Sequence, residues 1–365
     1  MTVDRSCQTN DRPYRQRKVF VAMSGGVDSS VAAYLLKRDG FSITGATMCL
    51  GIPDEEGRAA CCGPQAVRDA REVCDRLDMP HYVLDFSQQL HEDVVKDFVE
   101  SYAQGRTPNP CVRCNRYLKF TSLYKYARTC GYDAIATGHY AKIGTIDGGP
   151  VLMRHHDPKK DQTYFLYSIP VEVLEHVIFP LEHLEKNAVR DVAREAGLPV
   201  AEKKESQEIC FIPDDDYRRF LREHGLSDEP GPMVDTAGKR LGTHRGISNY
   251  TIGQRKGLGI ATGSPRYVVA LRRGDNTVVL GGKEDLLRSS LSAREVNLFV
   301  KQLPEVCTAK VRYTQSDVVC NAQMENGVLK VSFPEPVEAI TPGQSVVLYD
   351  GDIVLGGGII DDKLS

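Results

Sequence analysis

The sequence predicts an α/β protein with a doubly wound parallel sheet, a small central domain and a C-terminal antiparallel β-barrel. Three observations lead to this prediction. Short β-branched apolar runs alternate with helical patterns over the first half of the chain. A charged stretch between Pro199 and Pro213 interrupts that periodicity. Short alternating segments separated by turn residues follow residue 294, which is typical of a small barrel or sandwich.

The chain has 365 residues, which is too long for one ordinary core, so we expect several domains. We place the sheet domain at 18–210, the central domain at 211–285 and the barrel at 286–365. Residues 1–17 are polar and carry no apolar run, so we expect them to form a disordered extension.

The sheet domain opens with KVFVAM (18–23), an apolar run that leads through SGGVDSS into the helical pattern VAAYLLKRDG. Further predicted strands lie at 43–50, 81–85 and 133–137, with helical patterns such as PQAVRDAREVCDRL between them. In the barrel, TAKVRY, VLKVSF and QSVVLYD are the predicted strands, and the turns contain Asn326-Gly327 and Pro342-Gly343.

The composition is that of a soluble globular protein, with 41% hydrophobic and 26% charged residues. No apolar run approaches the roughly 20 residues that span a bilayer, and the N-terminal segment lacks the apolar stretch of a secretory signal. We therefore expect a cytoplasmic protein without a membrane partner.

The eleven cysteines fit reduced thiols better than disulfides, because the chain is large and the number is odd. Three groups have unusual neighbours: Cys61-Cys62, Cys111 with Cys114, and Cys210. The remaining cysteines are expected to be mostly small buried hydrophobic residues; they are Cys7, Cys49, Cys74, Cys130, Cys307 and Cys320.

The formal net charge of −3 conceals an uneven distribution. Residues 239–273 contain eight Lys or Arg and no acidic residue, which indicates either a phosphate-binding surface or a solvated basic face. Within this stretch, Arg255 and Lys256 are predicted to bind nucleic-acid phosphates. A second acid-free block, 106–119, surrounds Cys111 and Cys114.

SGGVDSS (24–30) lies between a predicted strand and a predicted helix, where backbone N–H groups and the helix dipole favour a bound anion. The segment fits neither the Walker A pattern nor GxGxxG. Asp28 beside phosphates indicates a bridging Mg²⁺ or an organiser of the loop. We expect a nucleotide to contact Ala22, Met23, Ser24, Gly25, Gly26, Val27, Asp28, Ser29 and Ser30.

SGGVDSS resembles the PP-loop of the N-type ATP pyrophosphatases, which cleave ATP to AMP and pyrophosphate. Five further blocks resemble those of the tRNA-specific 2-thiouridylase family: GRTPNPCVRCNRYLKF, ATGHYA, KKDQTYFLY, SQEICFIPDDDY and YTIGQRKGLGI. The resemblance runs from about Lys18 to the C-terminus. It implies a PP-loop ATP pyrophosphatase domain and a reaction that adenylates the C2 oxygen of the wobble uridine of tRNA and replaces it with sulfur.

The same resemblance assigns further residues. It implies that ATP also contacts Met48 and Gly138, and we expect Gly138 to mark a close backbone approach. It places Asn109, Pro110 and Cys111 beside the target base. That base must leave the anticodon stack before chemistry can take place on it. The residues that it places on the tRNA are Lys160, Asp161, Gln162, Arg312 and Tyr313.

The resemblance leaves two routes for the sulfur. In one, Cys210 carries a persulfide, and Cys114 liberates the sulfur by forming a disulfide with Cys210. Many family members have Asp where this chain has Cys111, and three thiolates also match a [4Fe–4S] cluster held by Cys111, Cys114 and Cys210. In either case we expect Arg113 and Arg116 to stabilise the thiolates and lower their pKa. A cysteine desulfurase or a sulfur-relay protein is the expected donor.

Two other functions fit part of the sequence. A PP-loop amidating ligase explains SGGVDSS but gives no role to the cysteines or the basic region. A non-catalytic tRNA-binding zinc protein would need a fourth ligand beside Cys111, Cys114 and Cys210, supplied by a histidine or by Cys61-Cys62.

Overall fold

The structure is a computed structural model, and it describes residues 17–52, 63–204, 209–212, 214–227, 229–260 and 263–361. The predicted extension 1–17, except for Arg17, lies outside the described residues, as do Cys7 and Cys61-Cys62. Within the described part, no helix is long and apolar enough to cross a membrane.

The first domain contains the predicted parallel sheet. Its five strands are all parallel and lie in the order β3-β2-β1-β4-β7. Helices cover both faces, because one apolar core forms against α1, α2 and α9 and a second against α4 and the helices that follow it. The strands are β1 (Lys18–Ala22), β2 (Ser42–Cys49), β3 (His81–Asp85), β4 (Ala134–Ala136) and β7 (Val177–Ile178). The helices are α1 (Val27–Arg38), α2 (Pro64–Arg76), α3 (Ser87–Leu90), η2 (His91–Val95), α4 (Lys96–Ala103), α7 (Thr163–Leu166), α8 (Val171–Leu174) and α9 (Lys186–Glu195).

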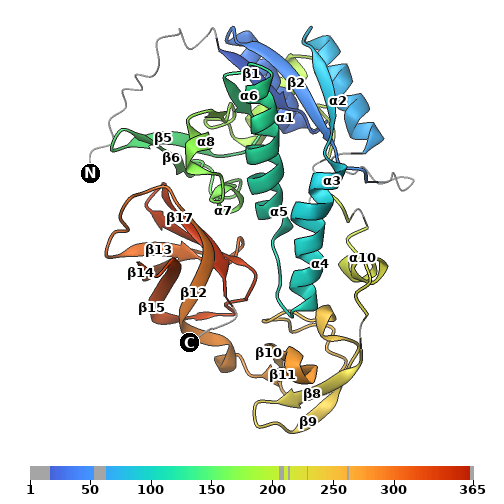
Figure 1. Ribbon diagram of the computed structural model, residues 1–365, viewed down its shortest axis with the longest axis vertical. Helices are drawn as coiled ribbons and strands as arrows, with labels where there is room; N and C mark the ends of the chain where they lie inside the picture. Colours follow the sequence, from blue (N-terminus) through green and yellow to red (C-terminus); the bar gives the residue numbers. More distant parts are fainter. Residues whose placement is uncertain are drawn as a thin grey trace.

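One long helix, residues 110–129, carries Cys111 and Cys114, and we call it the cysteine helix. It consists of α5 (Pro110–Arg113), η3 (Cys114–Leu123) and α6 (Tyr124–Thr129), and η3 is a ten-residue π-helix. Asn109 caps its start by accepting a hydrogen bond from the N–H of Val112 at 3.4 Å. Figure 1 shows this helix running beside α4, from the sheet towards the central domain.

The central domain is a four-stranded sheet in the order β10-β11-β8-β9, with a small apolar core of its own. Its strands are β8 (Gly231–Asp235), β9 (Arg240–His244), β10 (Tyr267–Arg272) and β11 (Thr277–Gly281). Its helices are η4 (Ile247–Asn249), η5 (Arg273–Asp275) and η6 (Glu284–Leu286). The helix α10 (Tyr217–Glu223) precedes this sheet and buries Phe220 and Leu221 in the core that also contains α4.

The C-terminal domain is the predicted antiparallel barrel. Six strands run in the order β12-β15-β14-β13-β16-β17, and pairing of β12 with β17 closes them. They are β12 (Leu287–Leu298), β13 (Cys307–Lys310), β14 (Val318–Glu325), β15 (Val328–Glu338), β16 (Ser345–Asp350) and β17 (Ile353–Ile360). The hairpin of β5 (Lys142–Ile146) and β6 (Gly149–Met153), which the sequence assigns to the first domain, extends this sheet through the pair Ile353 and Met153.

Candidate active site

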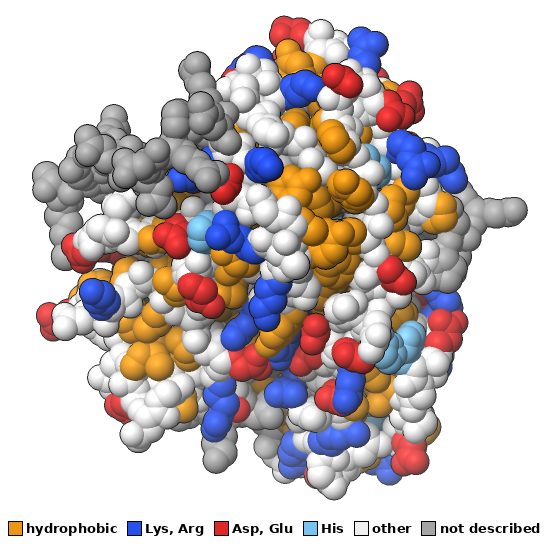
Figure 2. Space-filling model, turned by 45° about the horizontal axis from the view of Figure 1, so that its top comes forward, with side chains coloured by type: hydrophobic (Ala, Val, Ile, Leu, Met, Phe, Trp, Pro, Cys, Tyr) orange, Lys and Arg blue, Asp and Glu red, His pale blue; other side chains and the backbone are white. Residues whose placement is uncertain are grey.

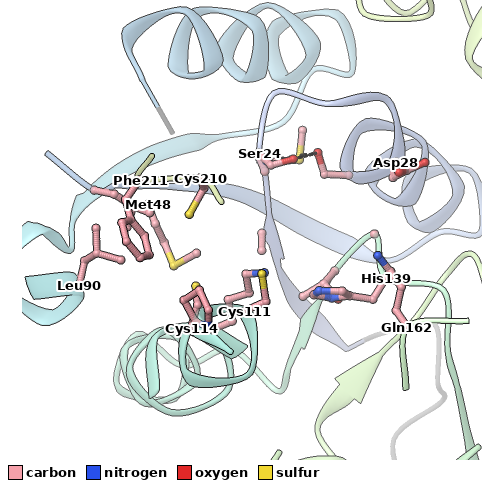
Figure 3. Close-up of a pocket in the computed structure, with 18 of the residues that line it drawn as sticks. Ser24, Asp28, Met48, Leu90, Cys111, Cys114, His139, Gln162, Cys210 and Phe211 are labelled. Atoms are coloured by element: carbon pink, nitrogen blue, oxygen red, sulfur yellow. Dashed lines mark hydrogen bonds between the residues drawn. The ribbon is translucent and has the colours of Figure 1, made fainter. Parts of the chain in front are cut away.

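A cavity of about 330 Å³ lies outside the carboxyl ends of β1, β2 and β4. In open α/β sheets, ligands bind at this edge, where the strand order reverses. Residues from the PP-loop line one end of the cavity, and Cys111, Cys114 and Cys210 line the other. Figure 3 shows the cysteines around Met48, with Ser24 and Asp28 on the far side. The fold thus brings the two predicted site segments together in one cavity.

Hydroxyl groups hold the PP-loop in shape. The Ser24 N–H donates to Ser29 Oγ at 3.2 Å, and the hydroxyls of Ser29 and Ser30 donate to the Gly26 carbonyl at 3.1 and 2.8 Å. The loop opens directly into α1, whose N-terminus favours an anion. The residues present therefore fit a polyphosphate.

Two glycines allow close backbone contacts around this loop. Gly25 has φ +68°, and a Cβ there would lie 2.3 Å from the carbonyl oxygen of Ala66. A Cβ on Gly138 would lie 2.6 Å from the carbonyl carbon of Asp28 and 2.7 Å from the nitrogen of Ser29. Gly138 therefore packs directly against the first turn of α1.

Asp28 is already paired with protein groups. Lys186 Nζ, at the start of α9, lies 2.7 and 2.8 Å from its two carboxylate oxygens, and the Tyr140 hydroxyl donates to Oδ1 at 2.7 Å. The Lys186 side chain is only 11% exposed. A carboxylate held by an ammonium and a hydroxyl can organise the loop, so this geometry fits the second of the two roles considered for Asp28.

Lys203 makes a second link to the loop. Its Nζ donates to the Gly25 carbonyl at 2.9 Å and forms an ion pair with Asp69 of α2. Lys203 precedes Cys210 by seven positions in the chain. Lys203 is therefore attached to the phosphate end of the cavity.

The three predicted cysteines differ in exposure at the other end of the cavity. Cys111 is exposed, Cys210 is intermediate, and Cys114 is 8% exposed. Among the described residues, no three His, Cys, Asp or Glu side chains lie at spacing that could hold a metal ion. In this arrangement the cysteines do not fit an iron–sulfur cluster or a zinc ion as a ready-made ligand set.

The electrostatic prediction for the cysteines was wrong in its direction for Cys114. Burial raises the pKa of the Cys114 thiol, and the opposing positive charge is Lys119. Arg113 instead forms ion pairs with Asp97 and Glu295, at 2.9 and 2.7 Å. A buried thiol beside one lysine is protonated at neutral pH, so it needs a change in its surroundings to react.

Two of the residues predicted to bind tRNA have internal partners. Asp161 is 4% exposed and accepts hydrogen bonds from the Thr163 hydroxyl at 2.7 Å and from the N–H of His155 at 3.2 Å. Gln162 Oε1 accepts from the N–H of Tyr140 at 2.8 Å, and Gln162 lines the cavity. Asp161 therefore shapes the turn, while Gln162 faces the cavity.

Arg312 joins two domains in this structure. Its guanidinium donates to the Ala339 carbonyl and the Thr341 hydroxyl of the barrel, at 3.1 and 2.6 Å, and to the Ile252 carbonyl of the central domain at 2.8 Å. Burial lowers the pKa of Arg312. Tyr313 is 36% exposed beside Phe165, with ring centroids 4.6 Å apart.

Arg255 and Lys256 of the central domain, which were expected to contact tRNA, are both exposed to solvent. The face seen in Figure 2 mixes Lys and Arg with Asp and Glu around a band of hydrophobic side chains.

Sequence analysis gave no role to four residues around the cavity. Lys119 and His139 line it, and Lys186 and Lys203 contact the PP-loop. Burial lowers the pKa of His139 well below its usual value, so the ring is neutral at pH 7. The block ATGHYA was a signal for His139, and GRTPNPCVRCNRYLKF was a signal for Lys119. Lys186 and Lys203 instead lie in ordinary helical or charged segments.

Three family models match the chain one after another. Residues 17–214 match the tRNA methyl transferase HUP domain family, 218–282 the tRNA methyl transferase PRC-barrel domain, and 288–360 the aminomethyltransferase β-barrel domain. Among solved structures, a 4-thiouridine synthetase–RNA complex with bound ATP aligns with 57% of this chain and 50% of its own, at 21% identity and a TM-score of 0.36.

Curated relatives align over nearly the whole chain. The tRNA-specific 2-thiouridylase MnmA 1 of Syntrophus aciditrophicus (strain SB) is 50% identical over 96% of this chain and 94% of its own. That of Clostridioides difficile (strain 630) is 46% identical over 96% of this chain and 100% of its own. A cavity that joins a PP-loop to three cysteines, in a chain this similar to these enzymes, identifies it as a member of the tRNA-specific 2-thiouridylase family.

Proposed function

We propose that this protein is an ATP-dependent tRNA sulfurtransferase that converts the wobble uridine of tRNA to 2-thiouridine. The observation that carries the proposal is the single cavity lined by the PP-loop at one end and by Cys111, Cys114 and Cys210 at the other. An activating nucleotide and a sulfur carrier can act on the same atom only if both reach it, and this cavity meets that condition.

The uridine C2 carbonyl is a poor electrophile, and oxide is not a usable leaving group. Transfer of AMP from ATP to the C2 oxygen releases pyrophosphate and converts that oxygen into a good leaving group. The PP-loop and the N-terminus of α1 would bind the phosphates, with Met48 and Gly138 beside the nucleotide. Mg²⁺ would accompany ATP and offset the charge of its phosphates.

We favour delivery of the sulfur by two cysteines. The terminal sulfur of a Cys210 persulfide attacks C2 and displaces AMP, which links Cys210 to the base through a disulfide bond. The Cys114 thiolate then attacks Cys210 Sγ, so that a Cys114–Cys210 disulfide forms and the thiolated base leaves with the electron pair. A cellular thiol reduces the enzyme disulfide, and a cysteine desulfurase or a sulfur-relay protein reloads Cys210 in the cytoplasm.

The [4Fe–4S] alternative is a second candidate because Cys111 lines the same cavity as Cys114 and Cys210. We derive no step through it, since the side chains as arranged do not form a ligand set. Cys111 would otherwise lie beside the target base with Asn109 and Pro110.

The test measures AMP release and 2-thiouridine formation with tRNA, ATP and a sulfur source. Asp28→Ala should reduce AMP release by about 100-fold or more, because the loop and Lys186 lose their organiser, while tRNA binding stays within a few-fold. Asp39→Ala, on the exposed end of α1, is the control. AMP release that needs no tRNA would favour the ligase, and a wild-type protein that releases none would favour a tRNA-binding protein.

The cysteine routes separate in the same assay. If Cys114→Ala and Cys210→Ala make no 2-thiouridine while Cys111→Ala is active, the persulfide route stands. If Cys111→Ala is also inactive and the anaerobically reconstituted wild type binds about four irons per chain, the cluster route replaces it.

A further inference from the structure

The C-terminal barrel contacts the cysteine helix at both sides of the segment Asn109–Cys111. Figure 1 shows the barrel beside the lower part of this helix, and the hydrogen bonds identify two contact points. One is the stretch before the helix at Thr107 and Pro108, and the other is Arg113 inside its first turn.

At the first contact point, the loop Pro342–Gln344 of the barrel pairs with Thr107. The N–H of Thr107 donates to the Pro342 carbonyl at 2.9 Å, and Gln344 Nε2 donates to the Thr107 carbonyl at 2.9 Å. Gly343 has φ +88°, and a Cβ there would lie 2.9 Å from the Thr107 carbonyl oxygen. Only glycine permits this backbone-to-backbone contact without displacement.

At the second contact point, Glu295 of β12 forms an ion pair with Arg113. Arg113 Nη1 and Nη2 donate to the two carboxylate oxygens of Glu295 at 2.7 and 2.8 Å. The same guanidinium donates to Asp97 of α4 at 2.9 and 3.1 Å. The Arg113 side chain is 16% exposed and that of Glu295 is 40% exposed, so solvent reaches the Glu295 side of this fork. Its two parallel hydrogen bonds make it stronger than a surface ion pair with a single contact.

The backbone of β12 is irregular where it presents Glu295. Glu295 has φ +50°, and the pairing of β12 with β17 shifts register between Arg294 and Asn297. A β-bulge re-aims the side chains of a strand and is often found next to an active site. A left-handed non-glycine residue costs free energy unless its contacts hold it, and here the contacts are those to the helix that begins with Pro110 and Cys111.

We propose that Glu295 and Gly343 are positioning residues for sulfur transfer, so that the barrel is a structural part of the active site. They hold Thr107 and Arg113, and thereby align Asn109, Pro110 and Cys111 with the cavity. The inference rests on the proposed function for its consequence in turnover, but the alignment itself can be measured without turnover.

The first experiment measures turnover of the full-length enzyme with Glu295→Gln. We expect kcat for 2-thiouridine formation to fall by about 10- to 100-fold, since misplacement of a reacting segment by an ångström has effects of this size. The KM for ATP and the Kd for tRNA should stay within about twofold. Arg113→Lys should reproduce the loss, because lysine keeps the charge but not the two-sided fork, and Glu295→Asp should restore part of it.

Matched controls separate alignment from simple damage to the barrel. Glu335→Gln removes an exposed carboxylate from β15 and should change nothing. Gly343→Ala should lower kcat as Glu295→Gln does, whereas Gly351→Ala, which also has a positive φ of +58° but no atom within 4 Å of its Cβ, should not.

The second experiment needs no turnover. The rate at which iodoacetamide alkylates exposed Cys111 is followed by mass spectrometry of the free enzyme, and it should change at least about threefold in Glu295→Gln and not in Glu335→Gln. Unchanged alkylation together with wild-type kcat would overturn the proposal, as would a loss of tRNA affinity equal to the loss of turnover. A wild type that forms no 2-thiouridine would overturn the proposed function instead, and the alkylation rates would still decide the alignment.

Discussion

The two ends of the active-site cavity are built in different ways. At the phosphate end, one short stretch of chain supplies the loop and its internal hydrogen bonds, and Lys186 and Lys203 of the same domain support it. At the cysteine end, Cys114 and Cys210 come from segments about 100 residues apart, and the barrel holds the cysteine helix through Glu295 and Gly343. The contacts of the first end lie within one domain, whereas the second end depends on contacts between domains.

The largest effect is expected at the phosphate end, from Gly138→Ala. The new Cβ would meet the backbone of Asp28 and Ser29 at 2.6 and 2.7 Å, and backbone cannot move aside as a side chain can. Overpacking of this kind costs about 1–3 kcal/mol of stability, and ATP-dependent AMP release should fall far more. Urea unfolding and AMP release are measured beside Gly274→Ala, whose Cβ meets no atom within 4 Å. Normal AMP release in Gly138→Ala would refute the close contact.

A smaller effect is expected between domains, from Arg312→Met. Three acceptors on Ile252, Ala339 and Thr341 lose their donor, which costs about 1–3 kcal/mol of stability, measured by urea unfolding.

Arg255→Gln should leave the unfolding free energy unchanged, because Arg255 is exposed. It should instead weaken tRNA binding and reduce the log–log salt slope by roughly 0.9 or less. If the salt slope of tRNA binding by Arg255→Gln equals that of the wild type, the basic face does not contact phosphate through Arg255.

The smallest change concerns pH at the cysteine end. Burial raises the pKa of Cys114, so its thiolate fraction, and with it the alkylation rate, should keep rising by about tenfold per pH unit beyond the usual thiol range. Lys119→Met removes the positive charge that opposes this shift, so Cys114 should react more slowly at every pH. Mass spectrometry of the peptide that holds Cys114 follows the rate, with denatured protein as the reference. A plateau near pH 8 would show that Cys114 is not desolvated.

This contrast also explains what the sequence could reveal. SGGVDSS carries its own turn, helix start and anion site, so the loop and the parallel sheet around it were predictable from local pattern. The motif blocks predicted that the three cysteines share one site, but they did not indicate how deeply each cysteine is buried. Asp161 was expected on the tRNA, yet it is enclosed, because loop polarity says nothing about which hydrogen bonds a carboxylate will accept.

Long-range partners were beyond local reasoning. Lys186 and Glu295 are single charged residues in ordinary patterns, and only the packed fold shows that they meet Asp28 and Arg113. The sequence assigned the hairpin 142–153 to the first domain. Its pairing with β17 joins residues some 200 positions apart, and a local pattern does not reveal such a pairing.

The π-helix in the cysteine helix makes the length of this segment as important as its composition. Hydrogen bonds in a π-helix close between residues five apart, so Cys114 and Lys119 return to the same side, and both line the cavity. In an α-helix, five positions would rotate Lys119 by about 140° away from Cys114. Deleting one residue between them would therefore change which side chains face the cavity, although Cys114 and Lys119 would both remain in the chain.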